Sequence, residues 1–551
     1  MQKKLAEIHR AGEEREAERR AERSGYPYLD LRTAPISVEA VQLISEDDAK
    51  TGELIGLQLK VKELAVAIVD PEKSTAKKVI QGLVKQGYNV KLFIVSLSAL
   101  TQALHMYQLT AGEAKEITGK VDIEKQRLAE LSERLTTLKS VNEEIGRFDP
   151  KDLTTTILFE IILAGALANR TSDIHLEAEE KRARIRFRID GALYDVYPAL
   201  PLKNYTALIS RIKLLSGLKI NVRGEAQDGR FTIGLTNKEI EMRVSIIPAE
   251  FGETIVMRIL DPAAINLSLE DLGLRADDLV LAEEALQSPN GLILNTGPTG
   301  SGKTTTLYAF LRHVNKSDIK IITIEDPVEY HLEGIEQTQV DSDAGYTFAS
   351  GLRSILRQDP DVILVGEIRD LETADIAMQA ALTGHLVFST LHTNDAVGAV
   401  PRLINLGVKP ATIGPALSLI IAQRLVRRLC SECKQPAKIP TALAEKITLF
   451  LKNLPARIDK NKYAKYNIFE PVGCVACNNL GYKGRIGIME FFKAGPELEQ
   501  VTLKEVSEIA LRKLAVVQEM VPMQSDGILK SLDGVTTLAE VEAVTGKIKW
   551  S

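Results

Sequence analysis

The residues whose types and spacing most clearly predict chemistry form a glycine-rich segment near the middle of the chain. It reads Gly291-Leu-Ile-Leu-Asn-Thr-Gly297-Pro-Thr-Gly-Ser-Gly-Lys303-Thr304. The residues before Gly297 predict a buried strand and those after Lys303 predict a helix, the context that a GxxxxGK[ST] phosphate loop requires. Backbone N–H groups of such a loop surround a phosphate at a helix N-terminus that already favours anions. The segment therefore predicts nucleotide binding.

Within this loop, Lys303 is expected to contact the β- and γ-phosphates, and the hydroxyl of Thr304 is expected to hold Mg²⁺. The nucleotide-binding residues predicted from the pattern are Gly297, Pro298, Thr299, Gly300, Ser301, Gly302, Lys303, Thr304 and Thr305. Hydrolysis needs further groups, because the loop alone only binds the phosphates.

Carboxylates that could act on the phosphates follow two further predicted strands. Glu367 ends the apolar run that begins at Asp361, and Glu325 and Glu329 follow the run that begins at Ile322. Because the carboxyl ends of parallel strands meet at one sheet edge, we expect these glutamates near the γ-phosphate. A carboxylate there can orient the attacking water, accept its proton or organise Mg²⁺. Any one of these glutamates could be an ordinary charged residue of a surface loop. The convergence of the strands argues against that interpretation for all three together. Which of the three is the general base stays open.

Two histidines flank the apolar run Leu386–Phe388 after a predicted helix. A lone histidine is more often a satisfied core group than a catalyst. This segment is of the same strand-end kind as those of the glutamates, and its histidines, His385 and His392, lie seven residues apart on either side of the run. His392 is therefore predicted to sense the γ-phosphate.

The four cysteines of the chain form two CxxC pairs, Cys430 with Cys433 and Cys474 with Cys477. Two such pairs in a cytoplasmic protein indicate a metal site more than disulfides, and four thiolates suit tetrahedral Zn²⁺. The segment 434–473 is longer than the roughly 15–20 residues that separate the pairs of a zinc ribbon, yet loop closure costs grow only logarithmically with length. Because cysteine fills every position, the predicted zinc site is structural; the alternative is four unrelated thiols.

The composition limits the protein class. The chain has 551 residues, 45% of them apolar and 26% charged, and its net charge is −5. These values predict several globular domains and give no reason to expect a dedicated nucleic-acid binder. No apolar run approaches the roughly 20 residues of a membrane helix, and the N-terminus lacks the apolar core of a signal peptide. We expect a soluble, cytoplasmic protein.

Changes in pattern along the chain predict its domains. Residues 26–110 alternate between short apolar runs and helical periodicity. Leu128, Leu131, Leu135 and Leu138 mark an amphipathic connector helix that could pack on a neighbouring subunit. The predicted segments are 1–25, a charged helix or frayed tail; 26–110, an α/β interaction domain; 111–149, a helical linker; 150–262, an arginine-rich α+β domain; 263–495, the nucleotide-binding domain with a zinc insertion at about 424–485; and 496–551, a helical end.

Together these motifs resemble the secretion ATPase superfamily, and most closely the branch that powers type II secretion and type IV pilus assembly. The resemblance is carried by the phosphate loop, Ile-Glu-Asp-Pro-Val-Glu after residue 323, the stretch 361–370, Thr-Gly-His-Leu-Val-Phe-Ser-Thr-Leu-His and, in the preceding domain, Thr-Ser-Asp-Ile-His and Gln-Asp-Gly-Arg. It covers about residues 150–500 strongly and 26–107 loosely. One departure is Arg-Gly-Glu-Ala at 223–226, where the family usually has proline.

The resemblance implies an α/β fold: a RecA-like P-loop ATPase domain preceded by a PAS-like domain and a small N-terminal α/β domain, with a tetracysteine zinc module. It implies a homo-hexamer that uses ATP and Mg²⁺, stands at the inner face of the cytoplasmic membrane and moves a membrane platform protein to build a fibre. By matching positions, Arg243 and Arg258 are expected to reach the γ-phosphate from the PAS-like domain, and Arg353, Arg357 and Arg369 to line or couple the site. The zinc pairs and the N-terminal domain resemble assembly motors and not retraction motors.

Two other functions stay open at this point. A nucleic-acid motor on a RecA-like core, such as a helicase or a DNA-uptake ATPase, is opposed by the acidic balance and by the lack of a basic groove with interleaved aromatics. A nucleotide-gated scaffold without turnover is opposed by the intact set of carboxylates. No direct nucleic-acid contact is expected, and contact with the membrane is expected only through partners.

Overall fold

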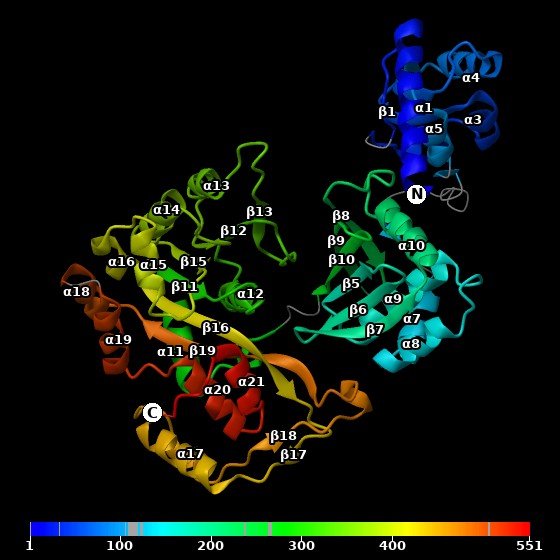
Figure 1. Cartoon of the computed structure of the whole chain (residues 1–551). Helices are drawn as coiled ribbons and strands as arrows, with labels where there is room; N and C mark the ends of the chain where they lie inside the picture. Colours follow the sequence, from blue (N-terminus) through cyan, green and yellow to red (C-terminus); the bar gives the residue numbers. More distant parts are fainter. Residues whose placement is uncertain are drawn as a thin grey trace. The chain divides into compact units, whose positions relative to one another are not determined.

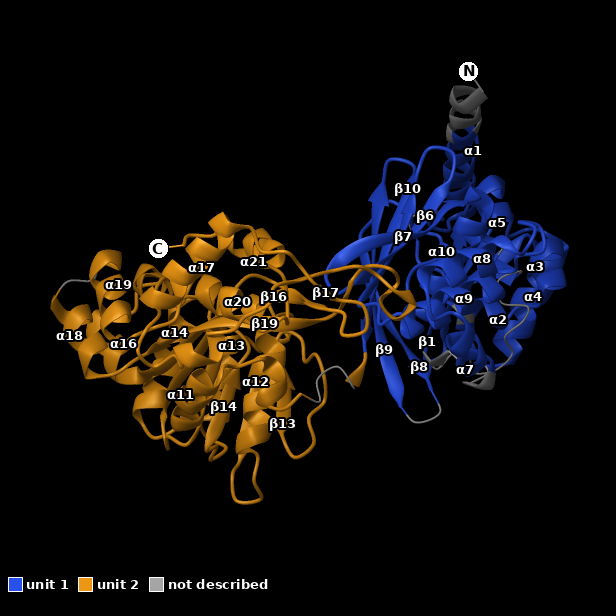
Figure 2. Ribbon diagram, turned by 90° about the horizontal axis from the view of Figure 1, so that it is seen from below, with its two compact units in different colours: residues 1–260 blue, residues 261–551 orange. Residues whose placement is uncertain are grey.

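The computed structural model describes residues 2–31, 34–104, 106–107, 120–121, 125–235, 238–262, 267–504 and 507–550. The chain divides into two compact units, residues 1–260 and 261–551, which Figure 2 colours separately. Each unit has its own sheets and hydrophobic clusters, and each is described by itself. Among the helices that can be described, none combines the length and the apolar composition that a bilayer-spanning segment needs.

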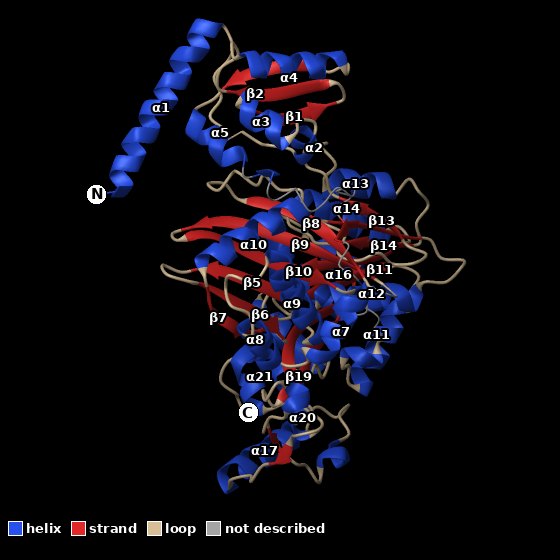
Figure 3. Cartoon of the chain, turned by 90° about the vertical axis from the view of Figure 1, so that its right-hand side faces the viewer, coloured by secondary structure: helices blue, strands red, loops and turns tan. Residues whose placement is uncertain are grey.

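The first part of unit 1 is a small sheet with helices packed on it, drawn in Figure 3. Strands β1 and β2 pair antiparallel, and β2 and β3 pair parallel. The elements are α1 Gln2–Ser24, α2 Val38–Gln42, α3 Glu46–Gly52, β1 Leu54–Lys60, β2 Glu63–Ile68, α4 Ser74–Lys85, β3 Asn89–Ile94 and α5 Leu97–Leu104. This mixture of short strands and helices is the one expected for residues 26–110.

Of the two alternatives for residues 1–25, a charged helix or a frayed tail, the structure has the helix α1, and its second half packs on the fold. Ala17 and Ala21 are buried. They lie four residues apart on one helix face, and their small side chains let the helix approach the domain closely. The carboxylate of Glu14 accepts hydrogen bonds from the hydroxyls of Tyr28 and Ser96, at 2.8 and 2.9 Å.

The linker differs from its prediction. Residues 108–119 and 122–124 lie outside the described part of the chain. The rest contains a short strand, β4 Lys120–Val121, and two helices, α7 Lys125–Arg134 and α8 Leu138–Gly146. Thr137 and Ser140 form a capping box that starts α8. Leu128, Leu131 and Leu135 are buried in the core of unit 1 itself. Their apolar stripe therefore packs within unit 1 and is not available to a neighbouring subunit.

The second part of unit 1 is a seven-stranded sheet in the order β4-β8-β9-β10-β5-β6-β7. Its elements are β4 Lys120–Val121, α9 Thr155–Ala168, β5 Asp173–Ala178, β6 Ala183–Ile189, β7 Ala192–Leu200, α10 Leu202–Leu215, β8 Gln227–Gly234, β9 Glu239–Ala249 and β10 Gly252–Leu260. In β6, buried residues alternate with partly exposed arginines, as expected of a half-buried strand. The buried face packs on α7–α10, which Figure 1 shows along one side of the strands.

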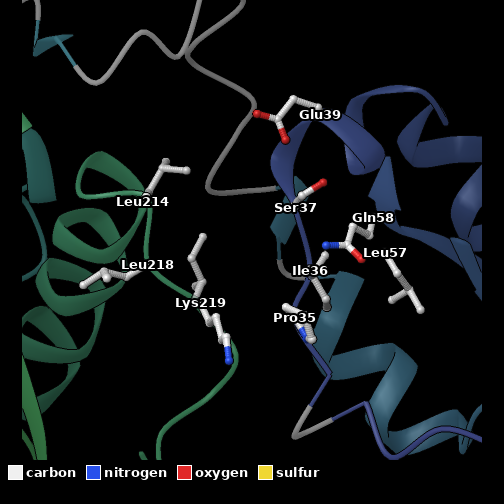
Figure 4. Close-up of a pocket in the computed structure, with 11 residues that line it drawn as sticks. Pro35, Ile36, Ser37, Glu39, Leu57, Gln58, Leu214, Leu218 and Lys219 are labelled. Carbon is white, nitrogen blue, oxygen red and sulfur yellow. The ribbon is translucent and has the colours of Figure 1, made fainter. Parts of the chain in front are cut away.

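A cavity in unit 1 lies between its two parts (Figure 4). It is lined by residues of the segment 35–39, the strand β1 and the turn after α10, among them Ile36, Gln58, Leu214 and Lys219. Beside it, the amide of Asn221 donates to the carbonyl oxygen of Leu31 at 2.8 Å. This cavity is in unit 1, whereas the phosphate loop is in unit 2, so the cavity is not the predicted nucleotide site.

Unit 2 is built on a second seven-stranded sheet, in the order β13-β12-β14-β15-β11-β16-β19. All neighbouring pairs are parallel except β16 with β19. Strands β11, β12, β14 and β15 are buried along their whole length, as expected for a sheet covered on both faces. The strands are β11 Gly291–Thr296, β12 Ile321–Glu325, β13 Glu336–Gln339, β14 Val362–Val365, β15 Leu386–Leu391, β16 Leu417–Leu429 and β19 Tyr482–Lys493.

Helices cover this sheet with two separate cores. Residues of α11 and α12 pack in one cluster with part of the sheet, and residues of α13–α16, α18 and α19 pack in another. The helices are α11 Ala276–Leu286, α12 Lys303–Val314, α13 Phe348–Ile355, α14 Leu371–Leu382, α15 Ala399–Asn405, α16 Pro410–Ala416, α18 Pro496–Lys504, α19 Glu508–Val517, α20 Met523–Leu532 and α21 Leu538–Thr545.

The segment between β16 and β19 is an insertion with its own small core. It contains β17 Gln435–Pro436, α17 Thr441–Asn453 and β18 Phe469–Glu470. Ile447 and Phe450 are buried with residues of α20, and the ring of Phe450 meets Trp550 edge-on at 6.4 Å between centroids. The insertion is therefore fixed to the C-terminal helices of unit 2.

Candidate nucleotide-hydrolysis site

The phosphate loop connects β11 to α12, with β15 and β16 on either side of β11. Gly300 and Gly302 have φ angles of 79° and 90°, in the left-handed region that glycine enters without steric cost. The hydroxyl of Ser301 is buried and has no hydrogen-bond partner among the described residues, while residues 298–300 are exposed. The loop thus presents open backbone and an unsatisfied polar group at the end of a central strand.

Lys303 is the first residue of α12 and carries the positive charge of the loop. Its Nζ donates to the carbonyl oxygens of Gly297 and Pro298, at 2.9 and 3.2 Å. Burial lowers its pKa, and the charge of Glu367 opposes that shift. An ammonium held only by neutral carbonyls can exchange them for phosphate oxygens. Thr304 follows on the exposed first turn of α12, where its hydroxyl fits the Mg²⁺ ligand that the pattern predicts.

The structure brings Glu367 and His392 together at the carboxyl edge of the sheet. Glu367 follows β14 and His392 follows β15, two adjacent parallel strands. The Nε2 of His392 lies 3.5 Å from the Oε2 of Glu367, and Arg369 forms an ion pair with the other oxygen of Glu367. The Glu367 side chain is 16% exposed, and its carboxylate is close enough to Lys303 for its charge to raise the pKa of that ammonium. His385 lies at the opposite end of β15, where its ring contacts the carbonyl oxygen of Ala380.

Glu325 differs from its expectation. Its carboxylate does not point to the open edge but is buried, and it accepts hydrogen bonds from Tyr308, Thr323 and Gln337. These donors come from α12, β12 itself and β13. Because three donors satisfy it in the core, Glu325 ties the phosphate-loop helix to its neighbouring strands.

Glu329 lies in the loop after β12, with a partly exposed side chain. The backbone N–H groups of Glu329 and Tyr330 contact the Tyr308 hydroxyl. Asp326 in the same loop lies 3.7 Å from the Nη1 of Arg369. The loop that carries Glu329 is thus anchored on one side to α12 and on the other to the Glu367 segment.

Of the three arginines of unit 2 that the resemblance implied, Arg353 lies in α13, Arg357 follows that helix, and Arg369 lies between β14 and α14. Arg353 forms an ion pair with Glu372 at the start of α14. Arg357 donates to the carbonyl oxygen of Arg353, 2.9 Å away, so its guanidinium folds back on the end of α13. Only Arg369 directly contacts a predicted catalytic carboxylate.

Arg243 and Arg258 lie in unit 1, side by side in the register of β9 and β10. Arg230 of β8 is the next partner of Arg243, and Asp173 of β5 is the next partner of Arg258. The Nε of Arg258 donates to Asp173 at 3.0 Å. The Nε of Arg243 lies 3.5 Å from Glu241, so both arginines have a carboxylate partner within unit 1. Their contact with the γ-phosphate stays a prediction.

Two groups beside the loop were not singled out from the sequence. The Oε1 of Gln423, on β16, accepts hydrogen bonds from Asn295 at 3.1 Å and Thr306 at 2.8 Å, joining β11 to α12. Glu490, on β19, is buried and accepts from the backbone N–H groups of Ala396 and Met523, at 2.7 and 2.8 Å. Polar residues inside otherwise apolar strands were the available signal for both.

The four cysteines meet at one point although a long segment separates the pairs. Their sulfur atoms all lie within 4.8 Å of one another; those of Cys430 and Cys474 are 3.9 Å apart, and those of Cys433 and Cys477 are 3.8 Å apart. Tetrahedral Zn²⁺ with Zn–S bonds of about 2.3 Å requires sulfurs about 3.8 Å apart, whereas a disulfide requires about 2 Å. The N–H groups of Gly473 and Gly481 point at the sulfurs of Cys433 and Cys477, each at 3.3 Å. The donor set fits Zn²⁺.

Comparison with known proteins agrees with this geometry. Residues 151–543 match the family described as type II/IV secretion system protein, and residues 24–114 match the MshEN domain. The chain belongs to the type II/IV secretion system ATPase family. It is 39% identical over 520 residues to the type IV pilus assembly ATPase PilB of Myxococcus xanthus, covering 94% of this chain and 88% of that protein. It is 42% identical over 449 residues to the type II secretion system ATPase E of Vibrio cholerae, covering 81% of this chain and 85% of that protein.

A solved structure supports the fold of this family member. The ATPase DotB of Legionella pneumophila superposes with a TM-score of 0.52 at 22% identity, covering 72% of this chain and 97% of that one. The predicted α/β fold, the resemblance to secretion ATPases and ATP hydrolysis as the activity are therefore confirmed. The exact domain boundaries and the roles of single site residues stay predictions.

Proposed function

We propose that this chain is a hexameric motor that couples ATP hydrolysis to the assembly of a type IV pilus or a type II secretion pseudopilus through a membrane platform protein. The observation that carries this proposal is the pairing of Glu367 and His392 beside a phosphate loop, in a chain whose relatives are named for pilus assembly and secretion. A cytoplasmic position at the inner face of the membrane is part of the proposal.

In this account, the backbone of residues 297–302 and Lys303 bind the phosphates, with Thr304 holding Mg²⁺, which would neutralise charge on them. Glu367 orients or deprotonates the attacking water. His392 contacts the γ-phosphate, so that the loop that follows β15 responds to whether this phosphate is bound. Glu329 is the second candidate for the base. Glu325, enclosed by its three donors, supports the position of α12.

Arg243 and Arg258 complete the site in the proposal, because guanidinium groups stabilise the charge that spreads over the phosphoryl oxygens. They lie in unit 1, so hydrolysis would depend on the approach of unit 1 to a phosphate loop. Such dependence is what a motor requires, since each hydrolysis event is then linked to a movement between units.

The test is ATP turnover measured against chain concentration, with native mass spectrometry of the same samples. We expect the rate per chain to rise with the hexamer fraction and to fall in Arg243→Gln and Arg258→Gln, which should still bind ATP. Full turnover by a monomer would refute the ring, and wild-type rates in both arginine variants would refute their role.

A nucleic-acid motor is the competing function. The acidic net charge opposes it, and it predicts a salt-sensitive DNA complex with DNA-stimulated hydrolysis. Hydrolysis that does not respond to single- or double-stranded DNA at low salt is the result expected of the assembly motor.

A further inference from the structure

Arg424 lies directly beside the beginning of the phosphate loop. Strand β16 pairs in parallel with β11 up to Thr296 and Ala422, so the next residues of the two strands remain neighbours. A Cβ atom on Gly297 would lie 2.6 Å from the carbonyl oxygen of Gln423 and 3.1 Å from the Nη1 of Arg424. Glycine is therefore required at position 297, and the guanidinium group sits against the loop backbone.

The hydrogen bonds of Arg424 all go to neutral acceptors. Its Nη1 donates to the carbonyl oxygen of Gln423 at 3.0 Å, and its Nη2 donates to the carbonyl oxygen of Asn394 at 3.1 Å and to its side-chain oxygen at 3.4 Å. No carboxylate in the described parts of the chain forms an ion pair with it. Burial lowers the pKa of this guanidinium, and the nearby charges of Glu490 and Asp395 only partly offset that shift. A partly buried cation that is bonded only to neutral groups would gain from contact with a further anion.

The nearby carboxylates that could pair with Arg424 are engaged elsewhere. Glu490 binds the backbone N–H groups of Ala396 and Met523, and Asp395 pairs with Arg512 at 2.8 Å. The other cation of the loop, Lys303, likewise has only carbonyl partners, and the charge of Arg424 is close enough to lower its pKa. Two cations without carboxylate partners thus stand at one end of the phosphate loop.

We propose that Arg424 is a further phosphate-binding residue of this ATPase, contributed by the same subunit and contacting the γ-phosphate. The γ-phosphate is the preferred contact because Asn394, to which Arg424 is bonded, belongs to the loop of His392, and His392 lies against Glu367. Arg424 then links the bound triphosphate to that loop. The inference rests on ATP binding by this family member and not on the proposed motor function.

The test compares ATP and ADP binding by the full chain, using fluorescent nucleotides with Mg²⁺. Arg424→Gln is expected to weaken ATP binding about tenfold to a hundredfold, the range for losing a charge-assisted hydrogen bond, and to change ADP binding by less than about threefold. Arg428→Gln makes the same charge change on the same strand, at an exposed position, and should bind both nucleotides like wild type.

Two results would overturn the proposal: wild-type ATP affinity in Arg424→Gln, or equal losses for ATP and ADP, which would indicate a purely structural role in holding Asn394. If that variant does not fold, Arg424→Lys keeps the charge but loses the planar fork. It should weaken ATP binding by about threefold to tenfold with ADP binding unchanged, and unchanged ATP binding there would equally refute the contact. A failure here would leave turnover and ring formation, and hence the motor proposal, untouched.

Discussion

The Nε2 of His392 lies 3.5 Å from the Oε2 of Glu367, across the ends of two adjacent parallel strands. In the proposed function, Glu367 acts on the attacking water and His392 senses the γ-phosphate. If Glu367 has that role, Glu367→Gln should keep ATP binding and lower turnover by about 10²–10⁴-fold, the range for losing a general base. Single-turnover hydrolysis measures this loss. Turnover near that of wild type would contradict the role of Glu367 and favour Glu329 as the general base.

Glu325 should behave differently from Glu367 when each is changed to glutamine. Its carboxylate accepts three hydrogen bonds in the core, and an amide would place N–H groups against some of these donors. We expect Glu325→Gln to lower the unfolding free energy of unit 2 by about 1–3 kcal/mol, and Glu367→Gln to change it little. Urea unfolding of both variants measures the difference. Undiminished stability with lost hydrolysis in Glu325→Gln would point to Glu325 as the base.

The cysteine cluster should bind one Zn²⁺ per chain. Cys430→Ser is expected to lose that ion and to destabilise the segment 424–485, because a metal bound by the clustered sulfurs would hold the two CxxC turns together. Ser431→Ala, inside the same turn but outside the ligand set, is the matched control. Elemental analysis with limited proteolysis is the measurement, and unchanged zinc in Cys430→Ser would exclude that cysteine as a ligand.

A buried ionic network should contribute strongly to the stability of unit 2. Arg275, 9% exposed, contacts Asp278 at 2.6 Å and Asp526 at 2.9 Å. Without Arg275, Asp278 still contacts Arg457 at 3.1 Å and Asp526 still contacts Lys530 at 2.6 Å. Each buried carboxylate therefore loses one of its two cations, and Arg275→Met should cost about 1.5–3 kcal/mol. Lys493→Met, which breaks the exposed pair with Glu284, should cost at most about 1 kcal/mol. Equal unfolding free energies for the two variants would contradict the network.

Glu490 should make stability depend on pH. Burial raises its pKa above the usual range, against the backbone N–H groups that favour the charged form. The Glu490 carboxyl therefore binds its proton more tightly in the folded chain than in the unfolded chain. Protonation of Glu490 stabilises the fold fully at pH values below the pKa of the unfolded state, and this stabilisation is lost as the pH rises through the pKa of the folded state. Glu490→Gln cannot titrate, so its unfolding free energy should fall less than that of wild type from about pH 5 to pH 8. Denaturant titrations at several pH values measure this, and parallel pH profiles would refute the shift.

Much of the site could be predicted from the sequence because it depends on local patterns. The phosphate loop, the fully apolar strands around it and the two CxxC turns are each continuous in the chain. Parallel pairing then brings Glu367 and His392 to one edge without further information.

The remainder depends on partners from distant segments. Glu325 has the spacing of a catalytic acid, and only Tyr308 of α12 and Gln337 of β13 turn it into a core residue. The stripe of Leu128 and Leu131 does not say which surface it covers. The lack of a carboxylate partner for Arg424 becomes apparent only when the described neighbours of β16 are placed around it.

The most direct test of the central claim is to trap Glu367→Gln with ATP in the cells that make this protein and to identify what co-purifies from their membranes. The account predicts a polytopic platform protein together with pilin-like or secretin components, whose identity would also decide between pilus and secretion. Recovery of DNA and DNA-processing enzymes without a membrane partner would contradict it.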